Sequence, residues 1–171
     1  MAAPAWRPMR ASDLPDVERI SAIVHPGYPE RAAVPAERLR LFPAGCLIAS
    51  RAGVTIGYAI AHPGIIGRPP PLDTLLGALP DGADCLYIHD VALLSDARGA
   101  GLGAVVAGIL GTLAKDDGYG FLALTAVSGS AGFWSRQGFS AAPIDKSLAS
   151  YGADAVYMAC AVSGKNYGTA M

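Results

Sequence analysis

The chain has 171 residues, a length that suits one domain with a single hydrophobic core. Hydrophobic residues make up 52% of the sequence and charged residues 16%, which excludes an intrinsically disordered chain. The formal net charge of −1 provides no general basic field for nucleic acid, and the sequence lacks the uninterrupted apolar run of about 18 residues that a membrane span needs.

The N-terminal residues and the cysteines bear on the compartment of the protein. Residues 1–10 contain arginines and prolines but no apolar stretch, so we predict no signal peptide. Cys46, Cys85 and Cys160 are odd in number and far apart, which favours free, mostly buried thiols in a reducing cytosol. We therefore expect a cytoplasmic protein that forms one domain, with a core over about residues 5–162 and a frayed tail after it.

The first predicted element is a helix over residues 13–24. N-cap residue types precede it, and apolar residues then recur with helical spacing. The helix ends at a His-Pro-Gly sequence, which breaks helices. A loop over residues 28–35 and a short helix over residues 36–41 follow.

A β-hairpin is predicted next, followed by a long connection. Two β-type runs, residues 46–50 and 54–61, flank a glycine-containing turn. The connection over residues 63–83 is rich in proline and glycine. Long connections in compact domains are usually functional or disordered, so this one either covers a ligand or is a plain surface loop.

The strongest local pattern is a strand, a glycine-rich loop and a helix. Residues 85–94 are typical of an apolar strand, and Arg-Gly-Ala-Gly-Leu-Gly follows at residues 98–103. The apolar residues downstream advance in steps of 3, 1, 3, 1 and 3. This spacing predicts a helix over residues 101–116 with one face packed on a sheet.

Three further elements complete the predicted order: a strand over residues 120–127, a helix over residues 130–137 and a last strand over residues 153–162. The sequence shows no internal repeat. Intermixed helices and strands of this kind predict an α/β or α+β fold, in which helices pack on the faces of one mixed sheet.

The glycine-rich loop is predicted to hold a pyrophosphate. Gly99, Gly101 and Gly103 let the backbone turn tightly and come close to a ligand. The new helix offers unpaired N–H groups and the positive end of its dipole, and Arg98 adds a cation. The alternative is a turn that merely connects a strand to a helix.

Two other phosphate ligands fit this loop less well. An ATP- or GTP-binding loop needs Gly-Lys-Ser/Thr, whereas Gly103 is followed by Ala104 and Val105. A dinucleotide fold places the loop after its first strand, whereas here about 80 residues precede it, and no acidic residue follows the next strand. ATP and GTP are disfavoured, and an oxidoreductase that uses a dinucleotide stays open as a poorer alternative.

Residues 88–139 resemble the core of the GNAT acetyltransferases. That family has a strand ending in a small–apolar triplet, then Arg/Gln-x-x-Gly-x-Gly/Ala and a helix, which here are residues 91–93, 98–103 and 101–116. A second family motif is a pair of aromatic residues followed by x-x-x-Gly-Phe, which here is residues 133–139. The two motifs stand in the family's order, and the resemblance covers roughly residues 5–162.

The resemblance implies a GNAT-like acyl-CoA N-acyltransferase fold, in which acetyl-CoA lies between splayed parallel strands at residues 85–94 and 120–127. The first strand would pair with the pantetheine arm, and the amides of the loop would hold the pyrophosphate. The implied cofactor-binding residues are Val91, Ala92, Leu93, Arg98, Gly99, Ala100, Gly101, Leu102, Gly103, Ser128, Phe133 and Trp134.

Transfer to an amine needs a base with a pKa near neutrality, and histidine is the usual candidate. Some aralkylamine acetyltransferases of this family use two histidines spaced i, i+2 on this strand, and the matching positions here are Tyr87 and His89. We hypothesise that His89 removes the amine proton, directly or through water; otherwise it is a strand histidine hydrogen-bonded in the core. Strand alternation predicts Tyr87, His89 and Val91 on one face and a structural Asp90 on the other.

Many members of the family have a tyrosine where this chain has Trp134, and it serves as general acid to the thiolate. An indole N–H cannot usefully release a proton, so Trp134 is expected to pack against pantetheine. The candidates for the acid are Tyr87, Tyr151, Tyr157, Ser130 and water, and a CoA thiolate needs little help near neutral pH.

The segments over residues 25–35 and 63–83 would border the acceptor site in this fold. Tyr28, Glu30 and Asp73 are then candidates to receive a cationic amine, although solvation is the commoner fate of surface acids. His25 and His62 each precede a proline and are expected to be structural, and the spacing of the histidines and cysteines predicts no metal site.

The sequence therefore predicts an N-acetyltransferase that moves an acetyl group from acetyl-CoA to a primary amine of a small molecule or protein. Direct attack in a ternary complex would release CoA. The alternative is a catalytically weak acyl-CoA-binding or sensing domain, which the Trp134 departure keeps open. We expect no nucleic-acid or membrane partner; homodimers are common in the family, but the sequence predicts no interface, acceptor or acyl-chain preference.

Overall fold

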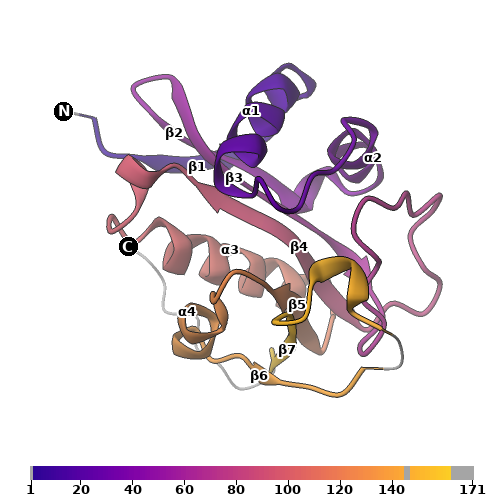
Figure 1. Ribbon diagram of the computed structural model, residues 1–171. Coiled ribbons are helices and arrows are strands. Elements are labelled where there is room, and N and C mark those ends of the chain that lie inside the picture. The colour runs from indigo at the N-terminus through magenta and orange to yellow at the C-terminus, as the bar shows by residue number, and fades with distance from the viewer. Residues whose placement is uncertain (1, 145–146, 163–171) are drawn as a thin grey trace.

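A mixed β-sheet runs through the molecule (Figure 1). The computed structural model describes residues 2–144 and 147–162. Over these ranges the sheet has seven strands in the order β1-β2-β3-β4-β5-β7-β6, and only β4 and β5 pair in parallel. The strands are β1 (Ala5–Pro8), β2 (Cys46–Arg51), β3 (Val54–Gly64), β4 (Cys85–Leu93), β5 (Phe121–Ala126), β6 (Ser140–Ala141) and β7 (Val156–Ala161).

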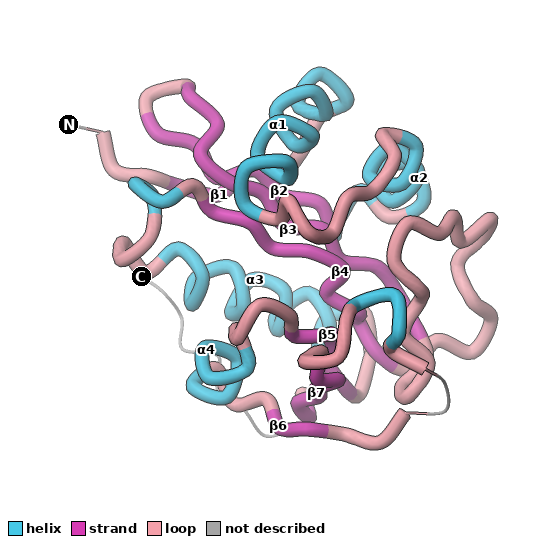
Figure 2. The backbone as a smooth tube through the Cα atoms, in the orientation of Figure 1, coloured by secondary structure: helices cyan, strands magenta, loops and turns pink. Residues whose placement is uncertain are grey.

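Helices cover both faces of this sheet (Figure 2). On one face lie α1 (Leu14–Val24) and α2 (Ala33–Leu41), and on the other lie α3 (Leu102–Asp116) and α4 (Ala131–Arg136). Short 3₁₀ turns are Ala11–Asp13, Pro43–Gly45, Ser95–Ala97 and Ala149–Tyr151. The prediction of a mixed α/β sheet with helices on its faces is confirmed.

Most predicted elements are present, and three departures from the prediction have physical causes. α2 begins at Ala33, three residues early, because Pro35 occupies the first helical turn, where its missing N–H leaves no bond unmade. The edge strand β1 and the two-residue β6 were not predicted. They are defined by pairing with β2 and β7, and neither has an alternating apolar pattern of its own.

The core is divided between the two faces of the sheet. The larger cluster packs α3 and α4 against β3, β4 and β5 through residues such as Leu86, Leu110 and Leu122. The second cluster packs α1 against the other face, where Ile20 meets Tyr58. Cys46, Cys85 and Cys160 are buried, as predicted. Among the helices of the described residues, none has the length and apolar character that crossing a bilayer requires.

The two parallel strands part in the middle of the sheet. β4 pairs with β5 from Cys85 opposite Phe121 only as far as Ile88 opposite Leu124. β4 then continues to Leu93 with β3 as its partner, while β5 stays paired with β7. The far half of β4 therefore has a free edge on its β5 side, along which an extended ligand could add as a strand.

A β-bulge at His89 changes the direction of the side chains along β4. The register with β3 runs from Ala61 opposite Ile88 to Ile60 opposite Asp90, so His89 is an extra residue. His89 and Asp90 consequently both lie toward α1, whereas Val91 packs with the α3 cluster. The predicted alternation is correct for Tyr87 and His89 and wrong for Val91 and Asp90, because it assumed an unbroken strand.

Candidate active site

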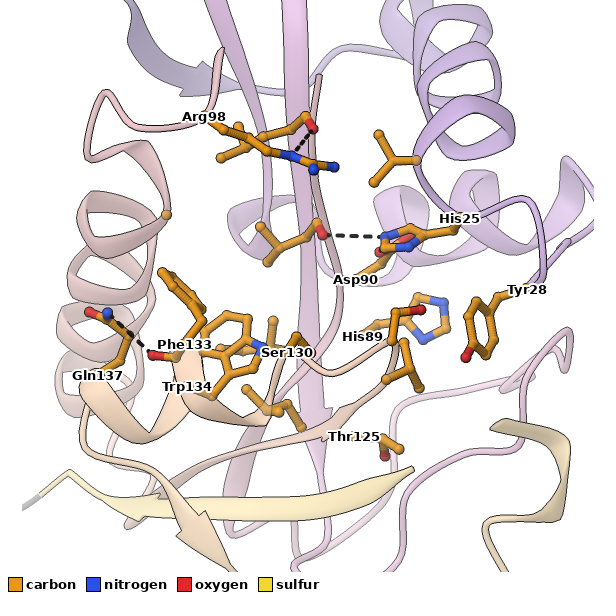
Figure 3. Close-up of a pocket in the computed structure, with 18 of the residues that line it drawn as sticks. His25, Tyr28, His89, Asp90, Arg98, Thr125, Ser130, Phe133, Trp134 and Gln137 are labelled. Atoms are coloured by element: carbon orange, nitrogen blue, oxygen red, sulfur yellow. Dashed lines mark hydrogen bonds and ion pairs between the residues drawn. The ribbon is translucent and has the colours of Figure 1, made fainter. Parts of the chain in front are cut away.

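A cavity of about 850 Å³ occupies the place where β4 and β5 part (Figure 3). Its wall combines the free half of β4, the end of β5, the first turn of α3, α4 and the connection between α1 and α2. Leu72 and Tyr151 add parts of two later loops. A volume of this size is typical of a ligand-binding cleft.

The free edge of β4 presents two residues to the cavity. The N–H of Leu94 donates to the Ile56 carbonyl, so alternate residues of this stretch turn their backbone toward β3. Val91 and Leu93 turn theirs toward the cavity, where the Val91 carbonyl lies 3.4 Å from His25 Nε2 and the Leu93 carbonyl accepts from Arg98 Nε at 3.3 Å (Figure 3). These carbonyls can accept hydrogen bonds from a ligand's amides.

The glycine-rich loop closes one end of the cavity. Gly99 and Gly101 have φ values of 82° and 77°, which a residue with a side chain adopts only with strain. Gly101 caps α3, so the N–H groups of the first helical turn point out of the helix end. A Cβ on Gly103 would stand 2.7 Å from Cζ of Phe133, so any other residue here would require this ring to move. The loop has the geometry of an anion cradle.

Most of the predicted cofactor-binding residues lie in the wall of this one cavity. They are Val91, Leu93, Arg98, Gly99, Gly101, Leu102, Gly103, Ser128, Phe133 and Trp134. Two are not part of it: Ala92 is buried beneath α1 on the far face of β4, and Ala100 is exposed in the loop outside the wall. Ala92 could therefore not touch a ligand in this cleft.

His89 and Glu30, predicted separately, form a hydrogen-bonded pair. His89 Nε2 lies 2.7 Å from Glu30 Oε1, and their side chains are 2% and 12% exposed. The other carboxylate oxygen of Glu30 accepts the backbone N–H of Asp73 at 2.9 Å. His89 Nδ1 is buried and has no partner within residues 2–144 and 147–162. His89 lines the cavity, but its Nε2 is engaged by Glu30.

A second histidine–carboxylate pair was not predicted. His25 Nε2 lies 3.0 Å from Asp90 Oδ1, and Tyr58 donates to Asp90 Oδ2 at 2.5 Å. Burial lowers the pKa of His25, but the hydrogen bond and charge of Asp90 outweigh it, so this pKa lies above its ordinary value. Burial acts to raise the pKa of Asp90, but His25, His89 and Tyr58 together lower it below its ordinary value. The expectation that His25 is structural rested on the proline after it, which says nothing about Asp90.

Tyr87 lies behind the cavity wall rather than in it. Its hydroxyl is 2.8 Å from the Thr125 hydroxyl, and Thr125 lines the cavity. Burial raises the pKa of Tyr87 well above its ordinary value. Burial also raises the pKa of Tyr151, which lines the cavity, to about 12. Ser130 lines the cavity as well.

Of the three predicted acceptor-binding residues, Tyr28 and Glu30 line the cavity and Asp73 does not. The Asp73 carboxylate accepts hydrogen bonds from the backbone and guanidinium of Arg31. The pKa of Asp73 is lowered, and the hydrogen bond from the Arg31 backbone is the largest cause. An exposed acid already paired in this way has no geometry for receiving an amine in the cleft. Its backbone N–H instead holds Glu30.

The family model of the acetyltransferase (GNAT) family matches residues 12–139. No curated protein shows a significant match. Among solved structures, the loading GNATL domain of CurA from Lyngbya majuscula has a TM-score of 0.79 at 11% identity, covering 95% of this chain and 99% of that one. Ard1 from Thermoplasma volcanium has a TM-score of 0.71 at 16% identity, covering 93% and 97%.

Arabidopsis thaliana Naa50, in complex with the bisubstrate analogue CoA-Ac-MVNAL, is also similar in structure. Its TM-score is 0.69 at 13% identity, covering 92% of this chain and 97% of that one. At these identities the likeness concerns the fold, and all three structures share it over nearly the whole described chain.

Proposed function

The chain belongs to the GNAT acetyltransferase family, and from that premise we propose that it transfers an acetyl group from acetyl-CoA to a primary amine. The observation that carries the proposal is that one cavity joins the free edge of β4 to the glycine cradle at the start of α3. A strand edge suits the two amides of pantetheine, and a helix N-terminus suits a pyrophosphate. Acetyl-CoA carries these groups in this order.

The residues of the cleft fit that cosubstrate. Val91 and Leu93 would pair with the pantetheine amides, and the amides of residues 99–103 with Arg98 would hold the pyrophosphate. Phe133 and Trp134 form an apolar wall beside them, with ring centroids 4.9 Å apart. Acetyl-CoA supplies an activated thioester, and the similar Naa50 structure contains a CoA bisubstrate analogue.

The acceptor amine would enter beside Glu30 and Tyr28, at the end of the cleft away from the glycine loop. The Glu30 carboxylate can accept N–H bonds from an ammonium group, and His89 and the Asp73 N–H fix its orientation. The hypothesis that His89 removes the amine proton then requires a route through Glu30, because Nε2 faces Glu30 and Nδ1 is buried. Attack on the thioester would be direct, within a ternary complex.

Thermal unfolding of the purified protein with acetyl-CoA, CoA, NADH and ATP tests this proposal. A ligand at 100 times its dissociation constant adds about 2.7 kcal/mol, or several degrees for a chain of this size. We expect shifts with acetyl-CoA and CoA and none with NADH or ATP. Release of CoA thiol should then follow on addition of primary amines.

The outcomes separate the alternatives. A shift with NADH alone would show that the glycine-rich loop binds a dinucleotide. If none of the four ligands shifts the unfolding temperature, acetyl-CoA is not the cosubstrate. Binding of acetyl-CoA without turnover of any amine would leave an acyl-CoA-binding domain. A Gly99→Val variant, strained at its positive φ beside the pyrophosphate position, should lose the CoA shift while keeping its fold.

A further inference from the structure

We propose that His25, held by Asp90 and Tyr58, is the general base that takes the proton of the acceptor amine. This inference rests on the proposed function and assigns it a catalytic residue. His25 lies at the C-cap of α1 and lines the cavity, while Asp90 is the residue after the β4 bulge. Both side chains are less than one fifth exposed, at 19% and 18%.

The contacts of His25 fix which ring nitrogen carries the proton. Nε2 faces two acceptors, Asp90 Oδ1 at 3.0 Å and the Val91 carbonyl at 3.4 Å, so the N–H of the neutral ring belongs there. Nδ1 then carries the lone pair. It has no hydrogen-bond partner in the described part of the chain, and it is not among the buried unpaired atoms. His25 therefore has a basic nitrogen available, and its side chain lines the cavity.

Asp90 is built to support a charged His25. Tyr58 holds its second oxygen at 2.5 Å, so the carboxylate cannot turn away from the imidazole. Tyr28 packs edge-on against the His25 ring, with centroids 6.5 Å apart, and limits its rotation from the other side. A carboxylate that orients a histidine and stabilises its imidazolium is the arrangement that proton acceptors need.

His89 is less suited to the same task. Its side chain is 2% exposed against 19% for His25, and its Nε2 is engaged by Glu30. The remaining nitrogen, Nδ1, is buried without a partner among the described residues. Proton transfer to His89 would need a carboxylate or water as carrier, whereas His25 needs none. We therefore assign His89 to positioning Glu30.

The Nδ1 lone pair of His25 takes one proton from R–NH₃⁺, and the N–H electrons become the amine lone pair. That pair forms the C–N bond at the thioester carbonyl, and the C–S electrons leave with sulfur. The second nitrogen proton ends on the thiolate to give CoA thiol, and the His25 imidazolium releases its proton to water.

The test compares His25→Gln with His89→Gln across pH and across acceptors. Loss of a general base typically costs about 10²- to 10⁴-fold in rate. His25→Gln should show this loss with alkylamines near neutral pH and recover much of it at about pH 10, or with weakly basic acceptors that are already neutral. Acetyl-CoA binding should be unchanged, and the matched control Asp16→Asn, at an exposed ion pair with Arg19 on α1, should behave as wild type.

The charged and titratable groups around His25 also enter the pH profile. They are Asp90 and His89 from β4, Tyr58 from β3, Glu18 from α1, Glu30 and Tyr28 from the α1–α2 connection, and Arg98 from the glycine loop. Burial lowers the pKa of His25, but the hydrogen bond and charge of Asp90 raise it above its ordinary value, so Asp90→Asn should move the acidic limb of the profile to lower pH.

Each result bears on one statement only. A wild-type protein that neither binds acetyl-CoA nor acetylates any amine would overturn the proposed function. If wild type turns over and His25→Gln keeps its rate and pH profile, the assignment of His25 is wrong and the family reaction stands. A loss of the neutral-pH rate in His89→Gln with none in His25→Gln would return the base to His89.

Discussion

At the scale of single residues, Asp90 is the charge around which the site is arranged. Burial acts to raise its pKa, yet the pKa lies below its ordinary value of 3.8, because the contacts with His25, the charge of His89 and the hydrogen bond from Tyr58 together outweigh burial. The pKa of His25 lies above its ordinary value of 6.5 through the same contact, against its own burial. Both side chains are therefore charged between pH 3.8 and pH 6.5, and the ion pair contributes to stability as well as to the proposed catalysis.

The linkage of these pKa values to folding gives a prediction. The stability that His25 contributes is fully present below pH 6.5 and is lost as pH rises through its raised pKa. The stability that Asp90 contributes is present above pH 3.8 and is lost as pH falls through its lowered pKa. His25→Gln should therefore reduce the free energy of unfolding more at about pH 5.5 than at about pH 9, by about 1–3 kcal/mol at the lower pH. Urea unfolding at both values measures it, and equal losses would contradict a charged pair.

At the scale of elements, the first turn of α3 packs closely against α4 at a glycine. Gly103 lies in the first turn of α3, directly beside the Phe133 ring. Gly108 lies in the same helix, and a Cβ there would meet nothing within 4 Å. A methyl group added at Gly103 would therefore collide with Phe133, whereas one added at Gly108 would point into open space.

This contrast predicts opposite effects of one substitution. Gly103→Ala should push the Phe133 ring into the cleft and weaken acetyl-CoA binding by about 1–3 kcal/mol, an overpacking cost. Gly108→Ala should leave binding unchanged and stabilise the fold by about 0.5–1 kcal/mol, because alanine is the better helix former. Calorimetric titration and thermal unfolding measure both, and equal cofactor affinity in the two variants would mean that Phe133 does not border the bound cosubstrate.

At the scale of the whole molecule, the long connection between β3 and β4 is fastened to the helical face rather than free (Figure 1). The buried Glu37 carboxylate accepts the backbone N–H groups of Leu76 and Gly77 at 2.7 and 3.0 Å. The buried Arg38 donates to the Thr74 carbonyl at 3.0 Å. This fastening holds Leu72 in the cavity wall and the Asp73 N–H on Glu30.

Releasing the connection should therefore affect the acceptor before the cosubstrate. Glu37→Gln leaves one of the two N–H groups without an acceptor, at a cost of about 1–3 kcal/mol. We expect faster hydrogen exchange at Leu76 and Gly77 and a raised KM for the amine, with CoA binding unchanged. Asp81→Asn, at an exposed position of the same connection, is the control and should alter neither; unchanged exchange in Glu37→Gln would show that the connection is held elsewhere.

The local features of the chain could be predicted because their signals are local. The apolar spacing of α1 and α3 reflects one buried helical face, and it predicted both helices to within one residue. The glycines before α3 were recognised because their positive φ excludes other residues. Glu30 and His89 were each named as candidates, yet the bond between them was not foreseen, since 59 positions separate them in the chain.

The amino-acid sequence by itself determined the mixed fold, the family motifs and the cradle, since each follows from side-chain periodicity or backbone freedom within a few residues. The tertiary structure decided the bulge at His89, and with it the side of the sheet that Asp90 faces. It also decided that His25 meets Asp90 and that the β3–β4 connection holds Glu30. The physical reason is that a bulge is a property of the register between two strands, and an ion pair depends on which distant segments packing brings together.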